Sequence, residues 1–437
     1  YSNGGFYIIT TNMGRGGNFV VTATNPAGPW SEPYWLNDAP GIDPSLFFDD
    51  DGKVYYTGNR KPEDGEKYSG HREIWIQEFD IHTMTLKGKK HTLWQGALSG
   101  AKWTEAPHLY KINGYYYLLV AEGGTMYHHA VTVARSKNIF GPYEGNPANP
   151  ILTHRHLGRN YPVANVGHAD LVETQNGQWW MVVLASRMYG GYYRNLGRET
   201  FLAKVTWEDG WPIVNEGKGR LKMTCQAPDL PQEKHDTPPV RELFDCASLA
   251  YHWNFIRTPR ERFWSLTERK GYLRLYLRPQ SIDKPENPSF IGRRQQHMNF
   301  SASTLMEFKP KGENESAGIV VLQNNNFYFS LEYTLENNRK KLRLTECCDG
   351  VKTVRRAVEV NSDRLYLRVS ANRQSYGFFY ATKPDEWIEL ARDIDGRILG
   401  NEKSASVTGA YLGMYASSNG ASSINHADFA WFEYSGF

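Results

Sequence analysis

The strongest constraint on the fold is a strand-and-turn unit that recurs in the first half of the chain. Three copies read DPSLFFDDDGKVYY, EAPHLYKINGYYY and HADLVETQNGQWW, and they open on Asp43, Glu105 and His168. In each copy a glycine follows nine residues after the opening residue, and an aromatic residue follows three residues after that glycine. Asp-Gly and Asn-Gly suit the positive φ of a tight hairpin turn. The copies therefore predict β-hairpins in one common register.

The spacing of these units indicates a β-propeller. Counting a further copy at Gly4, in YSNGGFY, the turn glycines are at positions 4, 52, 114 and 177. Strand-rich repeats of this length, each too small to bury its own apolar face, are typical of propeller blades. A sandwich with coincidental hairpins is the alternative. The copy at Gly4 lacks its opening strand, so we expect an incomplete first blade and further sequence upstream of Tyr1.

The composition excludes some classes of partner. The 50 basic and 47 acidic residues are interspersed and give a net charge of +3, which favours neither nucleic acid nor an anionic membrane as a partner. No apolar run approaches the roughly 18 residues that span a bilayer. The sequence therefore predicts a soluble protein and leaves its compartment and oligomeric state open.

The variable opening residue of the repeat predicts the functional site. The innermost strands of neighbouring blades run beside the propeller axis, so Asp43, Glu105 and His168 are expected to face one pocket. Two carboxylates in an aromatic-rich pocket suggest glycoside hydrolysis, in which one of them must be protonated near neutral pH. Glu105 lies between Trp103 and Pro107, which could desolvate it, and the charge of Asp43 would raise its pKa further.

Each of these residues also has a structural interpretation. Asp43 could cap an Asp-Pro turn, and Glu105 could be a solvated strand end. His168 could be a metal ligand, a hydrogen-bond donor to a sugar, or a core histidine with satisfied partners. Arg198, in NLGRET, could hold a sugar hydroxyl or form a structural salt bridge.

Three further segments are weaker candidates. HRH at 154–156 has metal-ligand spacing, but an exposed loop is the expected alternative. Within AEGGT, the residues from Glu122 to Thr125 are expected to turn at the rim of the pocket. The acidic run 49–51 is expected to be solvated in its hairpin turn.

The second half of the chain predicts a β-sandwich. The polar, proline-rich segment 226–239 is the expected linker between a propeller domain at 1–225 and a second domain at 240–437. Segments such as AGIVVLQ, NFYFSLEY and RLYLRVS alternate apolar and polar residues, as antiparallel strands buried on one face do. The absence of intervening helical patterns favours a sandwich.

Several long motifs resemble glycoside hydrolase family 43. GIDPSLFFDDDG, WTEAPHLYKINGYYYLLVAEGGT, GHADLVETQNGQWW and LGRETF resemble its β-xylosidases and α-L-arabinofuranosidases, and IGRRQQHMNF resembles the sandwich that follows the propeller in its xylosidase-type branch. The resemblance covers nearly the whole chain. It implies an all-β protein with a five-bladed propeller, whose first blade is absent or incomplete here, followed by the sandwich.

The resemblance also implies roles for residues. Glu105 matches the general acid, Asp43 the residue that raises the pKa of the acid and orients it, and Arg198 a contact to the bound sugar. His168 matches a histidine near the channel centre that holds a metal ion in some members, so a calcium ion in the channel is an open expectation, although no cofactor is required. Ala106 stands where the family commonly has glycine. The catalytic base of the family, an upstream Asp, has no counterpart.

These observations predict an inverting, exo-acting glycosidase. Its substrates would be plant xylan-type oligosaccharides or polysaccharides, from which it would release terminal xylose or arabinose. Because the base lacks a counterpart, we expect the 437 residues alone to be inactive or nearly so. A carbohydrate-binding propeller without catalysis is the alternative.

Overall fold

The structure is a computed structural model that describes residues 1–235 and 237–437. It divides into two compact units, each described here by itself. Unit 1 comprises Tyr1–Ser186 and Glu199–Gln232, and unit 2 comprises Arg187–Arg198 and Glu233–Phe437. The domain boundaries expected from the sequence stay predictions, and Asp236 of the expected linker lies outside the described residues.

Unit 1 is built from four sheets of consecutive strands. Their strand orders are β1-β2-β3, then β4-β5-β6-β7, then β11-β10-β9-β8 with β12 beside β10, and finally β13-β14-β15-β16. The strands are Phe6–Asn12 (β1), Gly17–Ala23 (β2), Tyr34–Trp35 (β3), Ser45–Phe48 (β4), Val54–Arg60 (β5), Glu73–Asp80 (β6), Thr85–Trp94 (β7), Glu105–Ile112 (β8), Tyr115–Glu122 (β9), Ala130–Ser136 (β10), Glu144–Gly145 (β11), Leu152–Thr153 (β12), Val163–Glu173 (β13), Trp179–Arg187 (β14), Glu199–Glu208 (β15) and Trp211–Val214 (β16). A 3-10 turn, Arg155–Leu157, precedes β13.

The turn glycines lie where the repeat predicts hairpins. Gly52 joins β4 to β5, Gly114 joins β8 to β9 and Gly177 joins β13 to β14, with φ values of 83°, 78° and 76°. Glycine adopts this left-handed conformation without steric cost. The aromatic residues of the repeat, three positions after each glycine, are all buried: Tyr55, Tyr117 and Trp180. The predicted hairpins and their common register are confirmed.

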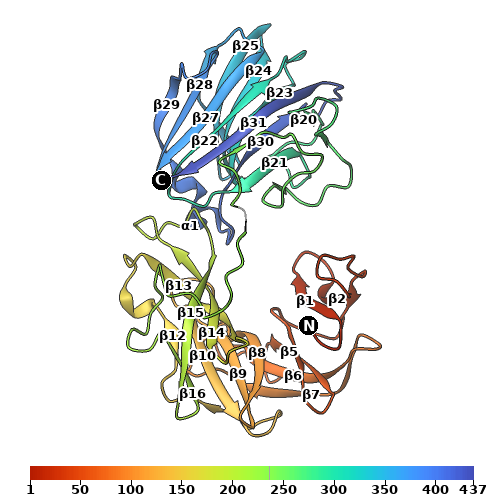
Figure 1. The fold of residues 1–437 in the computed structure, drawn as a ribbon, viewed down its shortest axis with the longest axis vertical. Helices are drawn as coiled ribbons and strands as arrows, with labels where there is room; N and C mark the ends of the chain where they lie inside the picture. The colour runs from red at the N-terminus through yellow and green to blue at the C-terminus, as the bar shows by residue number, and fades with distance from the viewer. Residues whose placement is uncertain (236) are drawn as a thin grey trace. The chain divides into compact units, whose positions relative to one another are not determined.

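Successive sheets of unit 1 contact one another through their leading strands. β1 lies beside β4, β4 beside β8, and β8 beside β13. Figure 1 shows the four sheets following one another in chain order, from red through orange to yellow-green. The result is a propeller-like arrangement of four blades. β1 follows the turn glycine Gly4, just as β5, the second strand of its blade, follows Gly52. β1 therefore corresponds to the second strand of the later blades.

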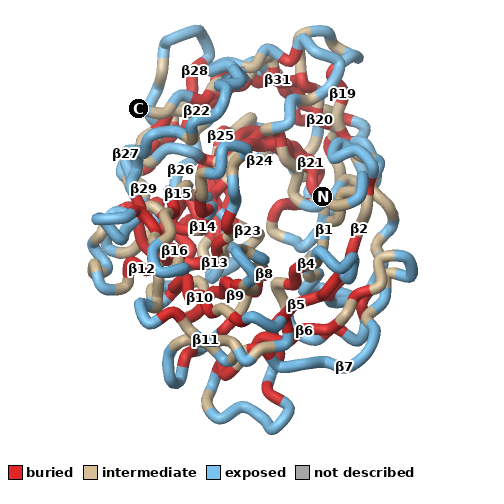
Figure 2. Tube along the Cα trace, turned by 60° about the horizontal axis from the view of Figure 1, so that its bottom comes forward, coloured by how far each residue is buried: buried red, intermediate tan, exposed pale blue. Residues whose placement is uncertain are grey.

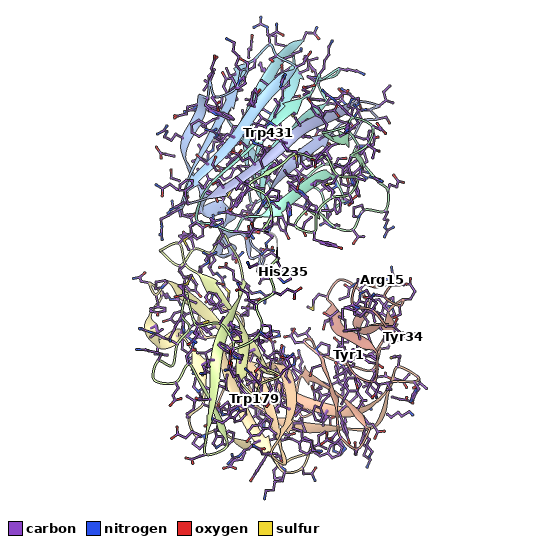
Figure 3. The ribbon with its side chains drawn as sticks, viewed as in Figure 1. Tyr1, Arg15, Tyr34, Trp179, His235 and Trp431 are labelled. Atoms are coloured by element: carbon purple, nitrogen blue, oxygen red, sulfur yellow. The ribbon has the colours of Figure 1, made fainter. Side chains whose placement is uncertain are left out.

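The blades pack through the apolar faces of their strands. β5 is buried along its whole length, and the buried stretches of the central strands are visible in Figure 2. Leu119 and Val131 of the third blade pack with Val166 and Val183 of the fourth in one cluster. At the end of that cluster Trp179, labelled in Figure 3, meets the ring of Trp207 edge-on at 5.4 Å. Each blade therefore buries its apolar faces against its neighbours, as the repeat requires.

Unit 2 contains a sandwich of two sheets. One has the order β19-β20-β31-β22-β27-β28-β29 with β17 beside β31, and the other has the order β18-β21-β30-β23-β24-β25-β26. The strands are Arg241–Glu242 (β17), Asn254–Phe255 (β18), Trp264–Ser265 (β19), Leu273–Tyr276 (β20), Ser289–Arg294 (β21), Asn299–Glu307 (β22), Ser316–Asn324 (β23), Phe327–Glu336 (β24), Arg339–Cys348 (β25), Val351–Glu359 (β26), Arg364–Asn372 (β27), Ser375–Ala381 (β28), Ile388–Asp395 (β29), Tyr411–Ser417 (β30) and His426–Gly436 (β31). Between β29 and β30 lie a 3-10 turn, Gly396–Leu399, and the four-residue helix α1, Asn401–Ser404.

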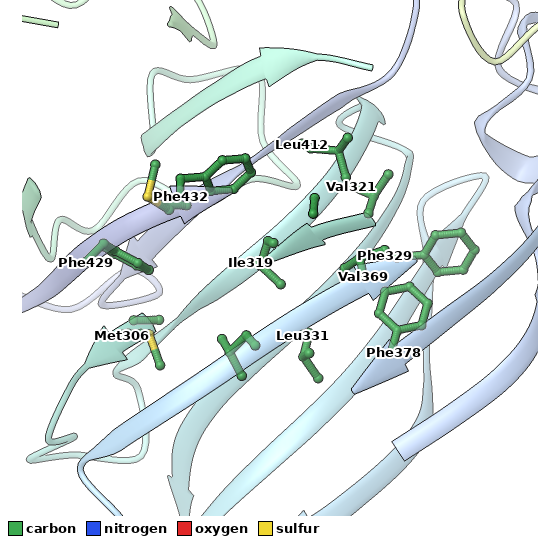
Figure 4. Close-up of a cluster of buried hydrophobic side chains, with 14 of the residues drawn as sticks. Met306, Ile319, Val321, Phe329, Leu331, Val369, Phe378, Leu412, Phe429 and Phe432 are labelled. Carbon is green, nitrogen blue, oxygen red and sulfur yellow. The ribbon is translucent and has the colours of Figure 1, made fainter. Parts of the chain in front are cut away.

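The core of the sandwich lies between its two sheets. Figure 4 shows Ile319 and Leu331 of one sheet packed near Val369, Phe378 and Phe429 of the other, and all five are fully buried. Burying such a side chain contributes about 1.5–3 kcal/mol. The alternating segments found in the sequence are strands here, so the predicted β-sandwich is confirmed. In the described part of the chain no helix has the length and apolar content needed to cross a membrane.

Candidate active site

Asp43 and Glu105 lie at equivalent places in two adjacent blades. Ser45, two residues after Asp43, donates a 2.6 Å hydrogen bond from Oγ to the carbonyl of Pro107, two residues after Glu105. Both segments have a left-handed residue here, with φ of 51° at Asp43 and 50° at Ala106. The pairing of β8 with β9 shifts register between Glu105 and His108, so Glu105 opens its strand at a β-bulge. Bulges of this kind re-aim side chains near active sites.

The backbone before Asp43 is fixed by side chains from two blades. Asn59 donates from Nδ2 to the Ile42 carbonyl at 3.1 Å, and Asn18 donates to the Gly41 carbonyl at 3.2 Å. Gly41 has φ of 89°, and a Cβ there would lie 1.7 Å from the Asn59 carbonyl oxygen. Only glycine fits this close approach. The turn that carries Asp43 is therefore held in one conformation.

Glu105 has the electrostatic environment of a carboxylic acid that stays protonated near neutral pH. Burial and, next, the negative charge of Asp43 raise the pKa of Glu105 to about 7, while the positive charge of Arg72 opposes the rise. Both effects disfavour the charged carboxylate. Glu105 can thus be a proton donor at neutral pH, and its interaction with Asp43 brings two of the predicted site residues together.

Glu105 opens onto a cavity of about 640 Å³. Residues from successive blades line it, among them Met13, Ile42, Arg72, Trp103 and Glu105. The guanidinium of Arg72 lies 4.8 Å from the ring centre of Trp103, and Arg72 also pairs with Glu66. The backbone N–H of Trp103 donates to Gly70 at 2.8 Å, which fixes the segment leading into Glu105. A cavity of this volume with an aromatic wall and a protonated carboxyl suits a small sugar.

His168 lies on β13, the leading strand of the next blade, with φ of 52°. Two residues further on, Asp170 accepts hydrogen bonds from His108 Nδ1 at 3.0 Å and from the Tyr110 hydroxyl at 3.1 Å, and both partners belong to β8. Burial alone would raise the pKa of Asp170, but these bonds and the nearby His168 outweigh it and lower the pKa. His168 therefore lies on the strand joined to the strand of Glu105, beside an anionic carboxylate.

Arg198 lies in a segment that belongs to unit 2. Its backbone N–H donates to the Val407 carbonyl at 3.2 Å, and the preceding Gly197 packs directly against the backbone of Gly409. Its predicted contact with a sugar stays a prediction.

Three minor expectations are wrong for one residue each, while His156, Asp50 and Asp51 are exposed as expected. His154 is buried, not exposed, and both ring nitrogens are engaged, Nδ1 with the Val163 carbonyl and Nε2 with the Leu221 N–H. Glu122 is buried, not at a rim, and accepts hydrogen bonds from the Ala97 N–H and the Thr132 hydroxyl. Asp49 is not solvated, because it binds Lys111 and Tyr116 of the next blade at 2.7 Å each.

The described residues offer no ready metal centre. Among them no three histidine, cysteine, aspartate or glutamate side chains gather as a metal ion would require. The calcium ion that the sequence left open therefore stays a prediction, with His168 as its single candidate ligand.

Sequence reasoning missed Arg72 and Asn59. Arg72 tunes Glu105 and lines its cavity, and Asn59 holds the turn before Asp43. Neither stands at the opening position of the repeat, so the alignment that found Asp43 and Glu105 carries no signal for them.

Comparisons with known proteins agree with this geometry. Residues 1–212 match the model of glycosyl hydrolases family 43, and residues 241–435 match the beta xylosidase C-terminal concanavalin A-like domain. A xylosidase/arabinosidase of Butyrivibrio fibrisolvens is 48% identical over 98% of this chain and 84% of its own. A non-reducing end alpha-L-arabinofuranosidase of Bacteroides ovatus is 39% identical over 99% of this chain and 80% of its own.

Solved structures give the same result. The xylan beta-1,4-xylosidase of Bacillus halodurans superposes with a TM-score of 0.91 at 33% identity, over 99% of this chain and 85% of that one. The sequence motifs, the propeller-like blades, the sandwich and these relatives agree: the chain belongs to family 43 of the glycosyl hydrolases, the family that its sequence resembles.

Proposed function

We propose that this protein is an exo-acting glycosidase that releases terminal xylose or arabinose from plant xylan-type oligosaccharides with inversion of configuration. The observation that carries the proposal is the place of Glu105 in the wall of a cavity of about 640 Å³, where burial and the charge of Asp43 raise its pKa to about 7. The names of the relatives, which include xylosidases and arabinofuranosidases, support the substrate class.

In this proposal Glu105 is the general acid. It donates its proton to the glycosidic oxygen as the bond to the anomeric carbon breaks, and a carboxylate base on the opposite face removes a proton from the attacking water. The negative charge of Asp43 helps to keep Glu105 protonated. Arg198 and His168 are proposed contacts to the sugar.

The five-blade count, the incomplete first blade and the identity of the base stay predictions. So does the expectation that the 437 residues alone lack activity for want of the base. An assay of this chain with an aryl pentoside tests that expectation, and robust hydrolysis would contradict it.

The role of Glu105 is tested with Glu105→Gln in a protein that includes the full coding sequence. An acid is needed most when the leaving group is poor, so kcat/KM should fall by about 10²–10⁴ for alkyl or sugar leaving groups and much less for activated aryl ones. Glu144→Gln, which changes an exposed carboxylate in the same way, is the matched control. Equal losses for all leaving groups would remove Glu105 from this role, and binding without any hydrolysis would favour the non-catalytic alternative.

A further inference from the structure

The outer face of one sandwich sheet carries polar and aromatic side chains in register. On neighbouring strands β31, β22 and β27, Glu433, Ser303 and Arg368 form one row, and Trp431, Leu305 and Tyr366 form the next. Residues adjacent to these rows in sequence, such as Phe432, Met306 and Leu367, belong to the core. Because side chains alternate along a strand, the two rows share the face opposite the core. Trp431 is labelled in Figure 3.

These rows form the floor of a groove of about 470 Å³. The loop before β29 contributes Asp385 and Trp387, and β17 contributes Arg241. Tyr366 meets the rings of Trp387 and Trp431 at 6.4 and 6.3 Å, so three aromatic residues form a continuous wall. The groove has room for one or two sugar rings and belongs wholly to unit 2.

The groove contains hydrogen-bond donors without acceptors. The guanidinium of Arg368 lies 3.7 Å from the ring centre of Trp387, and both Arg368 Nε and Trp387 Nε1 are buried without a hydrogen-bond partner among the described residues. Burial lowers the pKa of Arg368, although the charges of Glu433 and Asp385 oppose this. An unpaired buried donor costs about 1–3 kcal/mol, and more when it is charged. These two atoms are closed to solvent, whereas the terminal nitrogens of Arg368 are not among the buried atoms, so they are the donors that the groove offers to a ligand.

The charges of the groove favour an anionic ligand. Arg241 already pairs with Glu433 at 2.7 Å, and Arg364 lies 4.0 Å from Glu307. Arg368 forms no ion pair among the described residues, so its charge lacks a close counterion. A carboxylate matches the planar fork of a guanidinium with two parallel hydrogen bonds.

We propose that this groove is an accessory binding site for a saccharide that carries a uronate group. The carboxylate of the uronate is bound by the terminal nitrogens of the Arg368 guanidinium, and the sugar ring packs beside the aromatic wall. The choice of a saccharide among anionic ligands rests on the proposed function, because a polysaccharide hydrolase meets such groups on its substrate. The site itself rests on Arg368, which lines the groove and forms no ion pair among the described residues.

The test is calorimetric titration of the full chain in the Glu105→Gln background, where the ligand stays intact. The two ligands are a xylo-oligosaccharide with one glucuronate branch and the same oligosaccharide without it. We expect the acidic ligand to bind more tightly, and Arg368→Gln to weaken its binding by about tenfold to a hundredfold. Arg356→Gln, which removes an exposed arginine of β26, is the matched control and should leave binding unchanged.

Arg368→Lys keeps the positive charge but loses the planar fork of the guanidinium, so it should also weaken binding of the acidic ligand. Thermal unfolding of each variant verifies that the variant is folded. Equal affinity for the two ligands, unchanged binding in Arg368→Gln, or no binding at all would each overturn the proposal. The titration measures binding and not turnover. A negative result for this groove is therefore separate from a negative result for Glu105 as the general acid.

Discussion

Replacing Asp43 by Asn should lower the pKa of Glu105. The pKa of Glu105 is about 7, against 4.5 for an ordinary glutamate, and burial is the largest cause of the rise, with the charge of Asp43 next. Because burial is the larger cause and also exceeds the opposing effect of Arg72, removal of the Asp43 charge should cancel only part of the rise. Asn has nearly the same shape, so burial is unchanged. We therefore expect the pKa of Glu105 to fall in Asp43→Asn but to stay above the ordinary 4.5.

The assay is a ¹³C NMR titration of protein labelled at the glutamate Cδ. The resonance that disappears in Glu105→Gln identifies Glu105, and the titration of that resonance reports its pKa directly. Glu144→Gln gives the matched comparison for a surface glutamate. This measurement needs no turnover, so it applies to the 437-residue chain as it stands.

Two results would refute this reasoning. A pKa of Glu105 near 4.5 in the unsubstituted protein would show that the cavity does not desolvate the carboxyl. An unchanged pKa in Asp43→Asn would show that the two side chains do not interact, and the convergence of neighbouring blades on one site would then lose its support.

Three further predictions follow from the same contacts. Arg72→Gln removes a positive charge beside Glu105 and should raise the Glu105 pKa in the same NMR titration, the opposite sign to Asp43→Asn; a fall would contradict the assignment. Gly41→Ala should lower the melting temperature by several degrees more than Gly65→Ala. Both glycines have φ near 90°, but only at position 41 would a Cβ collide with backbone atoms. Equal decreases in melting temperature would mean that the turn at Gly41 relaxes freely. Glu105→Gln should raise the free energy of unfolding at pH 8 but not at pH 4. A carboxyl whose pKa is raised by folding destabilises the folded protein increasingly from pH 4.5 to about pH 7, and fully above pH 7. Denaturation curves measured across this pH range that lack this trend would count against the raised pKa.

The repeat made part of the site predictable. Aligning the turn glycines placed Asp43 and Glu105 at one position of neighbouring blades, and the bond from Ser45 to the Pro107 carbonyl joins those positions in space. This worked because the backbone hairpin is set by local residues, namely a positive-φ glycine and an aromatic strand. The aromatic and alternating strands of the sandwich were predictable for the same local reason.

The remaining features depend on contacts that no local pattern encodes. Arg72 reaches Glu105 from a loop outside the repeat, and Asp49 is buried by partners 62 and 67 residues away. Strand β26 carries no such local signal, because its residues are almost all exposed and lack the alternation that marks a half-buried strand. The groove at Arg368 was also missed, since its rows form only when β31, β22 and β27 pair.

The protonation of Glu105 is the most direct test of the account. A difference infrared spectrum between the unsubstituted protein and Glu105→Gln isolates the carboxyl of this one residue. We predict a neutral carboxylic acid band at pH 6 that is replaced by carboxylate bands at pH 8. A difference spectrum that contains only carboxylate bands at pH 6 would contradict the central claim that Glu105 is held protonated for proton donation.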